Sequence, residues 1–105
     1  MAEFTVEITG DHRDHLAQEL KDHLTAHHGQ VQIYAETDRV EPLTAVATVV
    51  SVVLAGVQAA DIIYKWWQQS RERANKVTIR TASGRVIEIS NVDPEQLEQL
   101  LEEED

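Results

Sequence analysis

Apolar and polar residues alternate over residues 4–9 and again over residues 30–35, which is the period of a strand with one buried face. Between these segments, leucines recur every four residues and predict an amphipathic helix over residues 11–28. Gly29 follows that helix, where a residue at C′ often adopts a left-handed conformation. Together the three elements predict a right-handed βαβ unit with two parallel strands.

The middle of the chain is unusually apolar. Residues 43–60 contain no charged side chain, and Pro42 precedes them where a first helical turn tolerates proline. We therefore expect one long helix over residues 43–73. Its valines follow helical spacing and would face a sheet. A second side of this helix would carry small residues suited to close packing against another helix: Thr44, Thr48, Ser51, Ala55 and Ala59.

Three environments suit this segment. It could be buried in the domain, it could present its second apolar side to a protein partner or a second copy, or it could span a membrane at about 43–60. Burial and partner contact combine naturally, because a small sheet covers only one side of a helix. A transmembrane span is the alternative, although Gln58 and several hydroxyl groups oppose insertion.

Trp66 and Trp67 follow the apolar segment. Adjacent helical residues point about 100° apart, so the two indoles cannot both enter one core. We expect at least one of them at an edge or an interface, where tryptophan is enriched. The alternative is that the pair forms a lid over one end of the core.

The last third of the chain predicts a hairpin and a helix. Alternating segments at residues 76–80 and 85–89 flank a turn that ends in Gly84. Asp93 is a suitable N-cap, and proline in the first helical position reinforces this helix start. The predicted fold is α+β: a small mixed sheet with helices packed on one face, in the order β-α-β-α-β-β-α, with one long apolar central helix.

Length and composition exclude several classes of protein. The 105 residues fit one domain, with an acidic tail at about 102–105. Nineteen acidic against nine basic side chains give a formal charge of −10, which disfavours nucleic acid and anionic lipid as partners. Cysteine is absent, so a disulfide scaffold and a thiol nucleophile are excluded. Because the first residues lack the pattern of a signal peptide, we expect a cytoplasmic protein.

Candidate chemistry is sparse. His23 and His27 have the i, i+4 spacing of two metal ligands, but the sequence offers no third ligand at a recognised spacing, so we expect no bound metal. The four glycines are isolated, and no serine lies in a nucleophile-elbow frame. We therefore expect a protein without enzymatic activity and without a cofactor. Arg71 and Arg73 begin the one local concentration of basic residues.

The order of these features resembles the effector-associated constant component family of bacterial conflict systems. The resemblance covers nearly the whole chain. It rests on the short βαβ start, on a Val/Ala-rich helix that ends in Tyr64-Lys65-Trp66-Trp67 with Arg71 and Arg73, on the hairpin of residues 76–89, and on Asp93-Pro94-Glu95 followed by Leu97, Leu100 and Leu101. It implies a small non-enzymatic component encoded beside effectors and NTP-dependent or protease partners in anti-phage systems. Such a component would couple sensing to effector deployment through protein contacts.

These observations predict an adaptor that self-associates or docks an effector or protease of the same system through the central helix. The residues that we expect at this interaction surface are Thr48, Ser51, Ala55, Ala59, Trp66, Trp67, Arg71 and Arg73.

Overall fold

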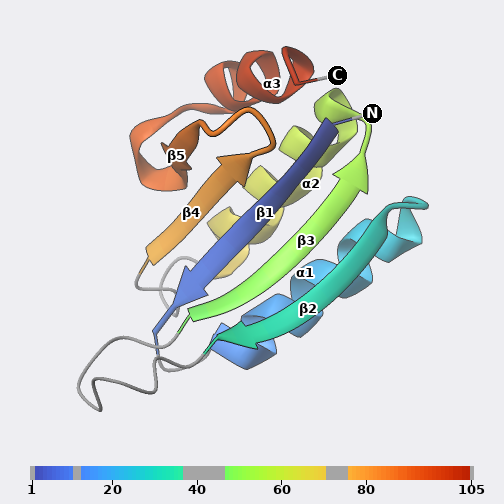
Figure 1. Ribbon diagram of the computed structural model, residues 1–105, viewed down its shortest axis with the longest axis vertical. Helices are drawn as coiled ribbons and strands as arrows, with labels where there is room; N and C mark the ends of the chain where they lie inside the picture. The colour runs from blue at the N-terminus through green and yellow to red at the C-terminus, as the bar shows by residue number, and fades with distance from the viewer. Residues whose placement is uncertain (1, 11–12, 37–46, 71–75, 105) are drawn as a thin grey trace.

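The computed structural model describes residues 2–10, 13–36, 47–70 and 76–104, which form a five-stranded antiparallel sheet with helices packed against one face (Figure 1). The strands lie in the order β2-β3-β1-β4-β5. The elements along the chain are β1 (Ala2–Thr9), α1 (Arg13–Ala26), β2 (Gln30–Glu36), β3 (Ala47–Leu54), α2 (Gly56–Ser70), β4 (Lys76–Thr81), β5 (Val86–Glu88), the 3₁₀ turn η1 (Ile89–Asn91) and α3 (Pro94–Glu102).

The core lies between the sheet and the two longer helices. The even-numbered residues of β1, from Ala2 to Ile8, are buried, while its odd-numbered residues face the other side of the sheet. The leucines of α1 and the Ile63 and Trp66 side chains of α2 cover these strand residues. The third helix, α3, packs against α2 at one end of the sheet (Figure 1). Strand periodicity and helical leucine spacing thus predicted the buried faces of β1 and α1 correctly.

The long helix predicted over residues 43–73 is wrong. Its described part divides into β3, which pairs with both β1 and β2, and the shorter helix α2. A continuous apolar run is compatible with a buried helix or a buried strand, so its periodicity could not decide between them. Composition held the missing signal, since five of the eight residues in β3 are β-branched and favour a strand.

The sheet is antiparallel rather than mixed. β1 and β2 run in the same direction, as the predicted βαβ unit requires, but β3 lies between them and is antiparallel to both. The inserted strand adds one element to the predicted order, which becomes β-α-β-β-α-β-β-α. The α+β class, with helices on one face of a small sheet, is confirmed.

The C-terminal third follows its sequence signals closely. β4 and β5 form the predicted hairpin, and Gly84 occupies its turn with φ of 96°. Asp93 caps α3 by accepting a hydrogen bond from the Gln96 amide at 2.8 Å, and the Gln96 side chain accepts one from the Asp93 amide at 3.1 Å. This reciprocal capping box strengthens the predicted helix start.

The end of α1 differs from its prediction by one residue. His28, rather than Gly29, adopts the left-handed conformation, with φ of 68°. The His28 amide donates to the Thr25 carbonyl at 3.0 Å, and the Gly29 amide donates to the Leu24 carbonyl at 3.0 Å. These two bonds form a Schellman motif in which His28 is the C′ residue.

The alternative of a transmembrane helix at about 43–60 is contradicted. Residues 47–54 lie in the sheet as β3, and α2 begins only at Gly56. In the part of the chain that the structure describes, no helix has both the length and the apolar character that crossing a bilayer demands.

Candidate interaction surface

In the described part of the chain, helices cover one face of the sheet and leave the other face uncovered. Residues that point away from α1 and α2 form the surface that we call the open face (Figure 1). Its members come from all five strands and are Glu3, Thr5, Glu7 and Thr9 in β1, Gln30, Gln32 and Tyr34 in β2, Val49, Ser51 and Val53 in β3, Lys76, Thr78 and Arg80 in β4, and Val86 and Glu88 in β5.

β3 is apolar on both of its faces. Val50, Val52 and Leu54 are buried beneath the helices, whereas Val49 and Val53 on the open face are only partly buried. Strands that are apolar on both faces are typical of sheets covered on both sides. A half-covered sheet with such a strand near its centre therefore exposes apolar surface that another molecule could bury.

An aromatic side chain extends this apolar surface. Tyr34, paired with Val49 across β2 and β3, is 52% exposed. Val86 at the opposite edge of the sheet is 58% exposed. Both values far exceed those of the core. Tyr34 extends the apolar surface of β3, whereas polar residues of β1 and β4 separate Val86 from it.

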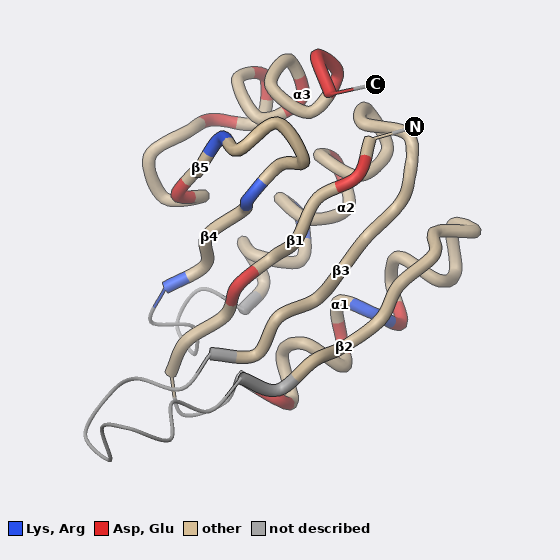
Figure 2. Tube along the Cα trace, viewed as in Figure 1, with Lys and Arg blue, Asp and Glu red and all other residues tan. Residues whose placement is uncertain are grey.

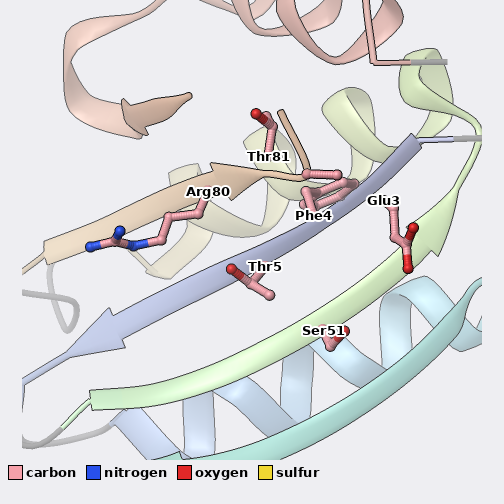
Figure 3. A pocket seen from close by; sticks show the side chains of 7 residues that line it. Glu3, Phe4, Thr5, Ser51, Arg80 and Thr81 are labelled. Carbon is pink, nitrogen blue, oxygen red and sulfur yellow. The ribbon is translucent and has the colours of Figure 1, made fainter. Parts of the chain in front are cut away.

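A hollow of about 230 Å³ lies on the open face and is lined by Glu3, Phe4, Thr5, Ser51, Arg80, Thr81 and Ala82. Figure 3 shows the Glu3 carboxylate and the Arg80 guanidinium on opposite sides of it. The Arg80 Nε donates to Glu7 Oε1 at 2.9 Å, so its charge is partly neutralised within the sheet. The hollow is shallow and offers hydroxyl groups and one free-standing carboxylate, which suits a protruding side chain of a protein better than an enclosed small molecule.

The positive charges of the described residues are largely neutralised. Lys76 and Arg80 lie in β4 and Arg85 directly before β5, while Lys21 and Lys65 lie in the helices (Figure 2). Four of them pair with carboxylates: Lys65 with Asp61, Lys76 with Glu88, Arg80 with Glu7, and Arg85 with Glu103. No described lysine or arginine lies within ion-pair distance of Glu3. On the open face of the described residues, Glu3 is therefore a carboxylate without a basic neighbour.

The stripe of small residues predicted on one helical side does not form a single surface. Thr48 lies in β3, points inward and donates to Asp14 Oδ1 at 2.6 Å. Ser51, three residues later, belongs to the open face and lines the hollow. Ala55 joins β3 to α2, and Ala59 is fully buried beneath the sheet. Of these four residues, Ser51 alone lies on the open face.

The two tryptophans separate as predicted, but Trp66, which was expected at the interaction surface, is the buried one. Trp66 is 2% exposed, and its Nε1 donates to the Leu16 carbonyl of α1 at 3.2 Å. Trp67 lies half-buried at the edge of the core, where its ring centroid is 5.6 Å from that of Tyr64. Arg71 and Arg73 fall outside the described residues.

His23 and His27 are exposed and border a second hollow, of about 200 Å³, between α1 and α2. Asp61 and Lys65 of α2 lie on its opposite side and pair with each other at 3.2 Å. Within the described ranges, no three histidine, aspartate or glutamate side chains are close enough together to hold a metal ion.

Sequence reasoning missed Tyr34, Val49 and Val53 as surface residues. The alternation of β2 placed Tyr34 on the same side as Gln30 and Gln32, which is a polar and hence exposed side. The outward position of the two valines could not be found, because it depends on β3 being a strand. The outward direction of Val49 and Val53 was therefore visible only once β3 had been placed in the sheet.

The fold and this surface define a small α+β protein with one uncovered sheet face. A family model, Effector Associated Constant Component 1, matches residues 5–104. The chain therefore belongs to this effector-associated family of conflict-system components. No curated protein and no solved structure matches the chain.

Proposed function

We propose that this protein is a non-enzymatic, cytoplasmic adaptor of a bacterial conflict system that docks an effector or protease of the same system on its open face. Family membership supports the link to effectors. The observation that carries the docking surface is β3, which is apolar on both faces while helices cover only one of them. Self-association is part of the same proposal.

The charges of the open face define the partner's chemistry. Val53 lies between Gln30 of β2 and Glu3 of β1 in the strand register. A partner would place an apolar or aromatic side chain on Val53 and a lysine or arginine beside Glu3. The formal charge of −10 would speed the encounter with such a basic surface.

Pairwise titration calorimetry tests this function with purified effector proteins encoded beside this chain. Val53→Asp should weaken partner binding about tenfold, because a buried valine contributes about 1.5 kcal/mol. The matched control is Val57→Asp, since Val57 is 41% exposed at the start of α2, away from the sheet surface. Equal loss of affinity in both variants would contradict the open face as the docking surface.

A second pair of variants tests the charge. Glu3→Gln removes the unpaired carboxylate of the open face, and Glu98→Gln removes an exposed carboxylate of α3 with the same change in net charge. Glu3→Gln should weaken binding roughly two- to fivefold, the range of an exposed ion pair. Glu98→Gln should leave the affinity unchanged. Binding that is insensitive to Glu3 would exclude a basic contact at this position.

A further inference from the structure

The two edge strands of the sheet differ in how well they are protected against pairing with a strand of another molecule. β5 has three residues and passes at once into η1, so it offers little backbone for pairing. β2 has seven residues and pairs with β3 along its whole length without a break in register. Its other edge faces no strand in the described part of the chain.

β2 also lacks the features that keep edge strands from pairing. Natural edges are blocked by lysine, proline, bulges or inward-pointing charges. The one charged residue of β2 is Glu36 at its end, and residues 30–35 contain no charged residue and no proline. Val31 and Ile33 point toward the α1 layer yet are only partly buried. An added strand with apolar residues at alternate positions would complete their burial.

We propose that β2 pairs with β2 of a second copy of this chain in antiparallel orientation, about a two-fold axis at Gln32. In this register Val31 lies opposite Ile33 of the second copy, and Ile33 opposite its Val31. Gln30 lies opposite Tyr34 of the second copy on the open side. Every inward position thus meets an apolar one, and every outward position meets a polar or aromatic one.

Charge identifies the second copy as the occupant. Two chains with a formal charge of −10 repel each other over most of their surface. The uncharged residues 30–35 form a strand at which two copies can meet without placing like charges opposite each other. The same residues give a basic peptide no carboxylate to recognise. A two-fold contact of this kind is closed and stops at a dimer.

Pairing at β2 would join the two five-stranded sheets into one continuous sheet with both open faces on the same side. The dimer would present two docking surfaces to a partner, which raises the affinity for a partner with two matching sites. The inference rests on the self-association within the proposed function, but not on the docking of an effector.

Cysteine cross-linking tests the axis directly, because the natural chain contains no cysteine. Directly opposed residues of antiparallel strands have Cα atoms about 4.5–5.5 Å apart, within the range that a disulfide bridges. Gln32→Cys should therefore form a disulfide-linked dimer when the full chain is oxidised with copper phenanthroline. Val86→Cys, on the other edge strand, is the matched control and should stay largely monomeric. Equal cross-linking of the two variants would overturn the proposal.

Charge substitutions at the axis provide a second test by sedimentation equilibrium. Gln32→Glu and Gln32→Lys each place two like charges opposite one another, so both should raise the dimer dissociation constant, roughly two- to tenfold. A lysine placed away from the axis should instead favour association, because it reduces the net negative charge of each chain. Val86→Lys and Val86→Glu measure this effect of net charge at the control edge.

Three results would overturn the pairing of β2: a monomer at all concentrations, a dimer unaffected by either change at Gln32, or a dimer strengthened by Gln32→Lys. A dimer that forms as predicted but binds no effector would support this inference and contradict the proposed docking function. The two proposals therefore fail separately.

Discussion

The Trp66 indole of α2 donates a hydrogen bond of 3.2 Å to the Leu16 carbonyl of α1, 50 residues earlier in the chain. This contact ties together the two helices that cover the sheet, at a point where Trp66 is almost fully buried. It satisfies the one polar atom of the indole within an otherwise apolar core. Trp66, rather than Trp67, enters the core because it lies on the same side of α2 as the buried Ala59 and Ile63.

Trp66→Phe should lower the free energy of unfolding by about 2–3 kcal/mol, because it removes both the hydrogen bond and part of a buried ring. Trp67→Phe makes the same chemical change at a half-buried ring and should cost clearly less. Urea denaturation followed by circular dichroism measures both values. An equal loss in the two variants would contradict the anchoring role of Trp66.

Thr48→Val should destabilise the fold by about 1.5–3 kcal/mol, the usual contribution of a hydrogen bond to a charged group. The substitution keeps the shape of the side chain but loses the 2.6 Å bond to Asp14 Oδ1, which joins β3 to the start of α1. Thr5→Val, on the open face, is the control and should change stability little. Chemical denaturation of both variants would reveal whether the buried hydroxyl matters.

Gly56→Ala should loosen the contact between α2 and α3. A Cβ atom at this position would lie closer to the Leu101 carbonyl oxygen than real Cβ contacts allow, so the α3 backbone must shift. We expect a loss of about 1–3 kcal/mol, typical of overpacking. In the Gly56→Ala variant, amide hydrogen exchange should become faster relative to the unsubstituted protein, and this increase should be larger in α3 than in the strands. Gln58→Ala, an exposed change in the same helix, should leave α3 protected.

His28→Gly should stabilise the protein. His28 holds the left-handed C′ position of α1, which costs a residue with a side chain about 1 kcal/mol relative to glycine. Thermal unfolding should therefore shift upward by a few degrees. The neighbouring change His27→Gly lacks this benefit and should not raise the melting temperature. A lower melting temperature for His28→Gly would show that its side chain contributes more than the backbone costs.

Partner binding should perturb the methyl NMR signals of Val49 and Val53 more than those of buried Val50 and Val52 on the other side of β3. The physical reason is that the outward valines would contact the partner directly, while the inward ones stay beneath the helices. Comparison of the four signals during a titration uses one strand as its own control. Larger changes at Val50 and Val52 would place the partner on the helical side.

Local chemistry predicted several elements well. The alternation in β1, the turn around Gly84 and the cap at Asp93 depend on neighbouring residues, so the sequence contains their signals directly. The helical end at His28 was missed by one residue. Its left-handed conformation is set by two backbone hydrogen bonds, and the adjacent glycine suggested the wrong position.

The candidate surface shows the limit of such reasoning. The sequence indicated correctly that the apolar segment after residue 43 has more than one apolar side, which led to the prediction of a partner contact. It could not show that Val49 and Val53 face outward while Thr48 and Ala59 are buried. For residues 48–53 that division follows from β3 being an interior strand of the sheet, where successive side chains alternate between faces, and Ala59 is buried because it lies in α2 beneath the sheet.

By itself, therefore, the sequence determined the α+β class and the family. It also indicated more apolar side chains than a sheet covered on one face can bury. Only the tertiary structure decided that β3 lies between β1 and β2, which face of the sheet stays open, and which strand forms the long free edge. The reason is physical: turns and caps are short-range interactions, whereas strand order and register are chosen by pairing between segments that are distant in the chain.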